Sequence, residues 1–592
     1  MHLPKKLKST LIYLFWAAVN GFIIASTLTL AVADYNGSNI FYIQSVPELN
    51  IPLLVISTAI LTAGFFVLFY LKKRLYRYIT PLCVTFFGIT VNMLSRVARP
   101  YFALVLSGIA VATVLVVKEK LPDNPSRLLK GKGLYVFVLA LTVLMTAQVA
   151  FAAIARHRAY SSSTFDLGIF AQMYHYMATD LTQNTTVERN ELLSHFAVHF
   201  SPIYYLLLPF YMIFPSVEFL LTMQAAVCFS GVIPLLLLCR RWRYSSGVTL
   251  GISIVFLLYP AFSGGLLYDF HENAFLVPLL LWALYFIQKN STPGIVISAL
   301  LLLCVKEDAG LYVVFLGLYA LLDKKTSKLN AVMLLTTGAA GFIAVTLLVD
   351  AVGEGIKVSR YQIYLTAGQH SLTDVVLNVI KNPAFFFSKL LSETKLLFLA
   401  QMLVPLLFLP ARTRKAADWV LAAPLVLVNL ASDYAYQTDI GYQYVFGSGA
   451  LLVFLFAKNI RYCREKPKVL TAAALAAAII MTGNVTAKYE YIEKFSWNYS
   501  DITATDRALA EIPRDAVIFS STYFTPHLAD CKELYMHPFV YEADSSIVPD
   551  YVVLDHRSGV LAEFGELMEY WRGEGYEVIS NEGYVTILKR GR

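Results

Sequence analysis

Charged residues are scarce in this sequence. Asp, Glu, Lys and Arg make up 15% of its 592 residues, whereas apolar and aromatic residues make up 57%. A soluble domain carries about 25% charged residues, because its core has to be covered by a polar surface. The composition therefore excludes an ordinary soluble protein and predicts a chain that crosses a membrane many times.

Cysteine is also sparse, and the sequence has no internal repeat of convincing period and no low-complexity tract. The six cysteines are scattered without the spacing of a metal site, and most lie in or next to apolar runs: Cys83, Cys228, Cys239, Cys304, Cys463 and Cys531. This pattern indicates neither a disulfide framework nor a cysteine-bound metal.

The basic residues that are present follow a topological pattern. The net charge is +8, and Lys and Arg fall in short clusters between apolar runs, at 72–77, 118–132, 240–243, 324–328, 412–415 and 458–468. Cytoplasmic loops of membrane proteins collect such clusters. We therefore interpret the positive charge as topology and expect no nucleic-acid partner.

Alternation between these clusters predicts about 15 spans, with the N-terminus in the cytoplasm and the C-terminus outside. The segments expected outside are 33–50, 155–200, 267–273, 306–308, 351–395, 433–444 and everything after about 486. The first apolar run resembles a cleaved signal peptide in its basic start, but its length of about 24 residues favours a membrane helix. Arg96 and Arg99 fall outside against the rule.

The segment 201–239 is long enough for two short spans, although the alternation allows only one. We expect 201–214 to form a re-entrant or interfacial helix that is broken at Phe214-Pro215. Prolines at 202 and 209 agree with this, because an interrupted segment is tolerated where other helices bury it.

The last hundred residues change character. AVIFSS, YVVLD, YEVIS and YVTILKR are typical of short strands, and LAEFGELMEYWRG is typical of an amphipathic helix. We expect a small extracytoplasmic α/β domain over 486–592. It would follow a four-span extension over 1–132 and a mainly α transmembrane helix bundle over 133–485, with outer loops 155–200 and 351–395.

Ionisable residues gather in four places on the expected outer side. They are Asp166 in SSSTFDLGIFAQ, the pair His195 and His199, the triad Asp269, His271 and Glu272 in YDFHEN, and Lys306, Glu307 and Asp308 in VKEDAG. Such groups near a membrane are costly and mark functional sites by default.

Each of these places also has a plain structural interpretation. Asp166 could cap a helix, YDFHEN could cap two, and VKEDAG could be a self-neutralising turn. The two histidines have a spacing that a metal could use, which is a weak signal alone. Four polar clusters on the same side of a membrane are harder to explain by chance, so the pattern favours one site.

Two further segments add candidate binding residues. Arg360 and Tyr361 lie in SRYQIYLTAG, and Tyr442 and Gln443 lie in SDYAYQTDIGYQY. The planar fork of arginine suits phosphate, and tyrosine and glutamine offer hydroxyl, amide and ring surfaces to a sugar. An interfacial aromatic belt is an equally good explanation for any one tyrosine.

The motifs FDLGIF, HFAVHFSPIYYLLLPFYMIFPS, LLYDFHENAF and LLLCVKEDAGLYVVFLGLYALL together resemble the bacterial and archaeal membrane family catalogued as domain of unknown function 2079. The resemblance covers roughly residues 140–590. That family is in turn similar to the GT-C glycosyltransferase superfamily, whose members take sugars from polyprenyl phosphate or pyrophosphate.

The resemblance implies a GT-C-like fold and a membrane glycosyltransferase. A sugar would pass from a polyprenyl-phosphate donor to an extracytoplasmic lipid, polymer or protein acceptor, with Asp166 as the base and inversion at the anomeric carbon. Lys306, Arg360, Tyr361, Tyr442 and Gln443 would bind substrate. The superfamily's acid followed by Lys-Pro-Pro is replaced here by His199-Phe200-Ser201-Pro202, so a metal or phosphate role of that acid, if retained, would pass to histidine.

A divalent metal or cationic side chains would neutralise the departing phosphate. The candidate metal ligands are His195, His199, Asp269, His271 and Glu272. Two alternatives remain open: a lipid or polysaccharide transporter or flippase, and a non-catalytic protein that keeps the GT-C-like scaffold.

Overall fold

The computed structural model describes residues 4–33, 49–95, 97–116, 129–323, 326–352, 358–557, 559–561 and 563–591. Arg96, most of the expected 33–50 loop and most of the basic cluster 118–132 lie outside the described residues. The chain divides into two compact units, which are described separately. The first contains residues 1–142, 232–265 and 379–487, and the second contains 143–231, 266–378 and 488–592.

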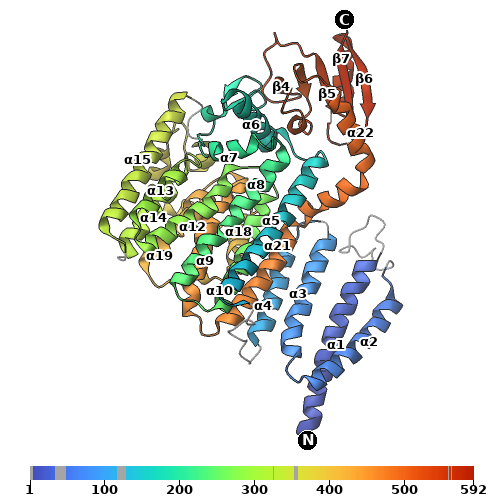
Figure 1. The fold of residues 1–592 in the computed structure, drawn as a ribbon, viewed down its shortest axis with the longest axis vertical. Helices are drawn as coiled ribbons and strands as arrows, with labels where there is room; N and C mark the ends of the chain where they lie inside the picture. The colour runs from blue at the N-terminus through green and yellow to red at the C-terminus, as the bar shows by residue number, and fades with distance from the viewer. Residues whose placement is uncertain are drawn as a thin grey trace. The chain divides into compact units, whose positions relative to one another are not determined.

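The first unit is helical (Figure 1). Its helices are α1 Lys5–Val32, α2 Ile51–Leu71, α3 Tyr76–Ser95, α4 Pro100–Val116, the start of α5 Lys132–Arg158, α9 Val232–Arg241, α10 Ser246–Leu257, α11 Pro260–Leu266, α17 Pro383–Leu390, α18 Glu393–Leu403, α19 Ala416–Val420, α20 Phe446–Asn459 and most of α21 Lys466–Trp497. Short helical turns link them: η7 Val404–Leu406, η8 Leu409–Arg412, η9 Leu425–Leu430, η10 Ala435–Thr438, η11 Gln443–Val445 and η12 Ile460–Tyr462.

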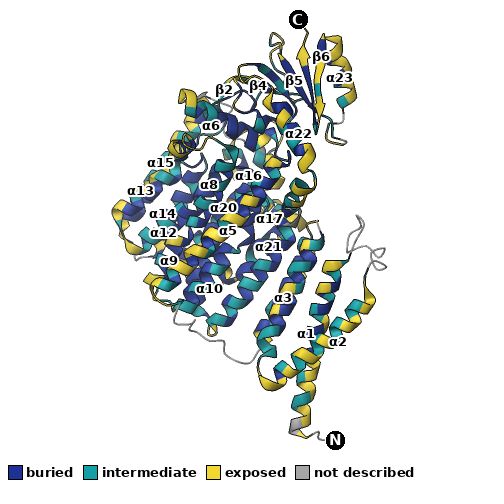
Figure 2. Cartoon of the chain, turned by 45° about the vertical axis from the view of Figure 1, so that its right-hand side comes forward, coloured by how far each residue is buried: buried dark blue, intermediate teal, exposed yellow. Residues whose placement is uncertain are grey.

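Helix α2 shows why these segments suit a membrane. Its 21 residues contain no charged side chain, Asn50 Oδ1 accepts a hydrogen bond from the Leu53 amide at 2.9 Å, and Pro52 lies in the first turn. At 1.5 Å per residue the helix is about 32 Å long, which matches a hydrocarbon core of about 30 Å. Figure 2 shows exposed residues along α1 and α2.

The second unit combines helices with a sheet. Its helical elements are the end of α5, η3 Thr164–Gly168, α6 Ile169–Asp180, η4 His195–Ala197, α7 Tyr204–Tyr211, α8 Val217–Ser230, η5 Glu272–Phe275, α12 Leu276–Lys289, α13 Thr292–Leu303, α14 Ala309–Asp323, α15 Lys328–Val352, η6 Val358–Tyr364, α16 Leu372–Lys381, α22 Tyr499–Ala510, η13 Thr525–His527 and α23 Phe564–Gly573. A small antiparallel pair joins β1 Asn184–Thr185 and β2 Leu193–Ser194.

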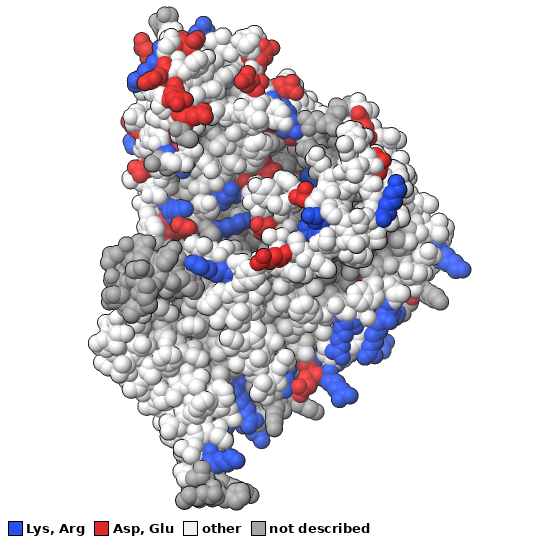
Figure 3. Space-filling view, turned by 180° about the vertical axis from the view of Figure 1, so that it is seen from behind, with Lys and Arg blue, Asp and Glu red and all other residues white. Residues whose placement is uncertain are grey.

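Nine helices among the described residues are long and apolar enough to cross a membrane, and four shorter apolar helices occur at 100–116, 292–303, 309–323 and 416–430. The protein is therefore a multi-pass membrane protein, but the expected count of 15 spans is not confirmed. Figure 3 is consistent with a membrane protein, because wide areas of the face in view carry no charged side chains.

The segment 201–214 forms only the eight-residue helix α7, with Pro209 inside it. Eight residues rise about 12 Å, which is too short for a span. The chain turns at Met212–Pro215, and α8 begins after Ser216, whose hydroxyl accepts from the Phe219 amide at 3.2 Å. The helix is interrupted between Tyr211 and Val217, so the predicted break at Phe214-Pro215 is confirmed.

The C-terminal module, residues 499–590, is built on a five-stranded sheet in the order β4-β3-β5-β7-β6. The strands are β3 Val517–Ser520, β4 Glu533–Met536, β5 Tyr551–Asp555, β6 Tyr576–Glu582 and β7 Val585–Arg590. Strands β4, β3 and β5 are parallel, whereas β7 is antiparallel to β5 and β6. The predicted strands and helix are confirmed, but the edge strand β4 was not predicted.

Both faces of this sheet are covered, because alternate residues of a strand point to opposite sides. Val552 and Leu554 pack with Met568 and Trp571 of α23. Val553 and Ile587 pack on the other face with α22, and that core also includes Tyr160, Ile169 and Val187. The chain between α5 and α7, which we call the 159–203 segment, is thus built into the core of the C-terminal module.

Candidate functional site

Asp166 lies in a strained turn directly after α5. Its φ of +66° and ψ of −76° fall in the region of the rare γ-turn that only a constrained residue adopts. Such a conformation costs on the order of 1–3 kcal/mol and persists where surrounding contacts fix it, often at functional sites. The Asp166 side chain is 27% exposed, and its Oδ1 lies 3.9 Å from Nε2 of His271.

The YDFHEN turn lies near this carboxylate and is held by contacts from α5 and α8. Arg156, at the end of α5, donates from Nη1 to Asp269 Oδ1 at 2.6 Å and to the Tyr268 carbonyl at 2.9 Å. Burial, followed by the Asp166 and Asp269 carboxylates, raises the pKa of the Tyr268 hydroxyl, which keeps it protonated. Gln224 of α8 accepts from the His271 backbone amide.

Glu272 is the centre of a buried polar network. Its Oε2 accepts from the Tyr204 hydroxyl at 2.8 Å and lies 2.8 Å from His271 Nδ1, and its Oε1 accepts from Lys306 Nζ at 2.8 Å. Burial would raise the pKa of this fully buried carboxyl, but His271 and Lys306 hold it well below its usual range. The other nitrogen of the same imidazole, Nε2, is the one that lies 3.9 Å from Asp166.

The two predicted histidines each contact a carboxylate of their own. His195 Nδ1 lies 2.8 Å from Glu188 Oε2, and His199 Nδ1 lies 2.9 Å from Glu307 Oε1. Burial would lower the pKa of His195, but Glu188 raises it above its usual value. Burial and the nearby Lys306 lower the pKa of His199 to about 4, so this ring is neutral at pH 7.

The predicted substrate-binding residues Lys306 and Arg360 both act on the carboxyl group of Asp308. Burial, then Glu307, raises the pKa of Asp308 to about 6, while Lys306 and Arg360 oppose the shift. Burial, then Asp308, raises the pKa of Tyr361. Element η6, which carries Arg360 and Tyr361, therefore meets the 306–308 turn.

Tyr442 and Gln443 belong to the first unit and are described there. The Tyr442 ring centroid lies 4.5 Å from that of Tyr436, and Gln443 is buried at the start of η11. Their expected contact with substrate stays a prediction.

Each of the five candidate metal ligands lies beside a charged group of the protein. His195 contacts Glu188, His199 contacts Glu307, Asp269 contacts Arg156, and His271 and Glu272 lie beside each other with Lys306. Among the residues that the structure describes, no group of three or more His, Cys, Asp or Glu is arranged to hold a metal ion. The present donor arrangement does not fit a metal, and a metal requirement stays a prediction.

Several residues of this network were not predicted from the sequence. Arg156 looked like an ordinary basic residue at a span end, Tyr204 was part of an apolar run, and Glu188 lay in a loop without a motif. The signal that could have found Arg156 is its position at the start of the expected outer segment 155–200, where the positive-inside rule disfavours arginine.

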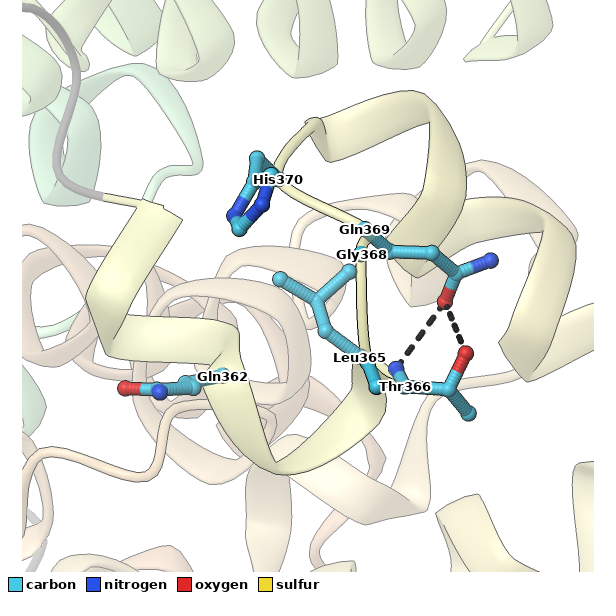
Figure 4. A pocket seen from close by; sticks show the side chains of 7 residues that line it. Gln362, Leu365, Thr366, Gly368, Gln369 and His370 are labelled. Carbon is cyan, nitrogen blue, oxygen red and sulfur yellow. Dashed lines mark hydrogen bonds between the residues drawn. The ribbon is translucent and has the colours of Figure 1, made fainter.

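A pocket of about 440 Å³ lies in the segment after η6 (Figure 4). Its wall includes Gln369, whose Oε1 accepts from the Thr366 amide at 3.0 Å and from the Thr366 hydroxyl at 2.9 Å. The remaining lining residues are Gln362, Leu365, Ala367, Gly368 and His370. It contains none of the residues predicted from the sequence.

The fold and this network define a multi-pass membrane protein with a polar site between α5, the YDFHEN turn and the 306–308 turn. The sequence matches the family described as Predicted membrane protein (DUF2079) over residues 156–579. The chain belongs to this family, and the predicted resemblance to it is confirmed. No match was found among the curated proteins.

Among solved structures, the chain is similar to two of ArnT from Cupriavidus metallidurans. The structure bound to undecaprenyl phosphate has 11% identity and a TM-score of 0.49, with 78% of this chain and 100% of that chain covered. The apo structure has 12% identity and a TM-score of 0.46, with 78% and 99% covered. Likeness at this level carries neither activity nor ligand to this chain.

Proposed function

We propose that this protein is a membrane glycosyltransferase. It transfers a sugar from a polyprenyl-phosphate donor to an extracytoplasmic acceptor, with the 159–203 segment and the C-terminal module on the outer side. The observation that carries the proposal is the Asp166 carboxylate: it is partly exposed on a strained turn, 3.9 Å from His271, beside a network that holds Lys306.

Asp166 is the general base. It accepts the proton of the acceptor hydroxyl while the acceptor oxygen bonds to the anomeric carbon from the side opposite the phosphate. The bond from that carbon to the phosphate oxygen breaks, and its electron pair leaves with the phosphate. A phosphate is a stable anion, so one carboxylate suffices and no general acid is needed. The anomeric configuration is inverted.

His271 and Tyr268 position this base. Glu272 Oε2 lies 2.8 Å from one nitrogen of the His271 ring, and the other nitrogen lies 3.9 Å from Asp166 Oδ1. Tyr268 stays protonated beside Asp166 and supplies a hydroxyl dipole to the carboxylate. Fixed partners of this kind hold a catalytic group in the orientation that the reaction needs.

The departing phosphate requires positive charge, and Lys306 and Arg360 supply it. Electrostatic stabilisation of developing charge is commonly the largest single contribution to catalysis. Lys306 is held by Glu272 at 2.8 Å, and Arg360 lies near enough to Asp308 to oppose the rise of its pKa. Since the donor set does not fit a metal, no step is routed through one.

The test uses the full chain in lipid nanodiscs with radiolabelled undecaprenyl-phosphate sugars and host membrane extract as the acceptor source. We expect the wild type to release undecaprenyl phosphate and pass label to the extract. Asp166→Asn should lose turnover at least about 100-fold, as expected for a missing general base, and still bind undecaprenyl phosphate. The exposed Asp180→Asn, in the same segment, is the matched control.

Retained turnover in Asp166→Asn would refute the base. A wild type that neither binds undecaprenyl phosphate nor moves any of the sugars would refute the whole function.

A further inference from the structure

The C-terminal module holds the chain on the N-terminal side of Asp166. The Thr164 amide donates to Thr522 Oγ1 at 3.1 Å, and the Thr164 hydroxyl donates to the Thr522 carbonyl at 3.3 Å. The hydroxyls of Thr164 and Thr525 are 2.9 Å apart. Thr164 and Thr525 are both fully buried, so the contact between their hydroxyls is shielded from water, whereas Thr522 is half-buried.

Thr525 also lies close to the chain on the C-terminal side of Asp166, at Gly168. A Cβ atom added to Gly168 would lie only 2.8 Å from Thr525 Oγ1. The φ of Gly168 is −65°, which any residue adopts. Glycine is therefore needed here for space, because the backbone approaches the threonine closely.

A third contact anchors the start of the segment. The Tyr160 hydroxyl donates to Asp506 Oδ1 at 2.5 Å, and its ring stacks on His527 at a centroid distance of 4.1 Å. Contacts with the module thus flank Asp166 on both sides. A strained residue keeps its conformation only where such contacts outweigh the 1–3 kcal/mol or so that the strain costs.

We propose that Thr522 and Thr525 are positioning residues for the transfer reaction, and that the C-terminal module is a working part of the site through them. They touch Thr164 and Gly168, not the reacting atoms, and act by fixing the direction of the Asp166 carboxylate. This inference rests on the proposed function, in which Asp166 is the base.

The kinetic test compares Thr525→Val, which removes the hydroxyl, with Thr525→Ser, which keeps it. We expect kcat of Thr525→Val to fall about 10- to 100-fold with KM unchanged, because a misplacement of about 1 Å has an effect of this size. Thr525→Ser should restore most of kcat. Thr503→Val is the matched control, since the Thr503 hydroxyl bonds only within α22.

Equal kcat in Thr525→Val and Thr503→Val would overturn the inference, and so would an equal loss in Thr525→Ser and Thr525→Val.

A second measurement needs no turnover. Amide hydrogen exchange over residues 161–168 should be faster in Thr522→Val than in wild type, because the Thr164 amide loses its acceptor. Thr522→Ser and Thr503→Val should exchange like wild type. Unchanged exchange in Thr522→Val would overturn the inference. A wild type that transfers no sugar would refute the proposed function, and the exchange result would still decide whether Thr522 holds the chain around Asp166.

Discussion

Removing only one partner of the buried Lys306–Glu272 ion pair should strongly destabilise the folded protein. Their side chains are 3% and 0% exposed, and the charged atoms lie 2.8 Å apart. At an effective dielectric constant of 20 the attraction over that distance is about 6 kcal/mol, a large part of which offsets the lost hydration. Removing one partner leaves a buried charge and costs about 3–5 kcal/mol.

We therefore expect Lys306→Met and Glu272→Gln each to lower the thermal unfolding temperature of the detergent-purified protein. Unfolding is followed by tryptophan fluorescence. The double variant removes both charges and should be more stable than either single variant. The half-exposed pair Lys494–Glu490, 3.5 Å apart, supplies the control, because Lys494→Met should cost less than about 1 kcal/mol. A double variant as unstable as the two losses combined would refute the reasoning.

Two further predictions concern acidity and the C-terminal hairpin. The pKa of Asp308 is raised to about 6 in the folded protein, whereas in the unfolded chain an aspartate has a pKa of about 4. Between these two pH values the folded protein keeps a proton that the unfolded chain has released. The stability of wild type relative to Asp308→Asn should therefore fall as the pH rises from 4 to 6, and a flat or opposite trend in unfolding temperature would contradict this. Gly583 has a φ of +60° and its added Cβ would lie 2.3 Å from the Asp501 carbonyl oxygen, so Gly583→Ala should cost more than about 1 kcal/mol. Gly565→Ala, whose Cβ meets nothing within 4 Å, should unfold like wild type, and equal unfolding temperatures of the two variants would show that the close approach does not matter.

The elements that local patterns define were predictable. An uncharged run of about 20 residues has few stable conformations besides a membrane helix, because its backbone must bond to itself in lipid. Alternating runs such as YVVLD predicted the strands, and YVVLD is β5. Strand β4 was missed because its four residues, ELYM, are too short to show a period, and its pairing with β3 supplies the bonds that define it.

The sequence predicted which clusters of ionisable residues belong to the candidate site, but not the contacts between them. The sequence pointed to Asp166 and YDFHEN because ionisable groups beside apolar runs are costly wherever they lie. It could not show that Glu272 contacts Lys306 and Tyr204, or that the two histidines contact separate carboxylates. Among the described residues no group of three or more His, Cys, Asp or Glu is arranged to hold a metal ion, and the candidate ligands contact protein charges such as Glu188 and Arg156, which spacing alone does not reveal.

The sequence alone determined that the chain is a multi-pass membrane protein with a C-terminal α/β module, since composition and periodicity are properties of neighbouring residues. Only the tertiary structure decided that Arg156 pairs with Asp269 and that Thr522 and Thr525 hold the turn around Asp166. Those bonds join residues more than one hundred positions apart, and hydrogen bonds depend on distances and angles that no local pattern specifies.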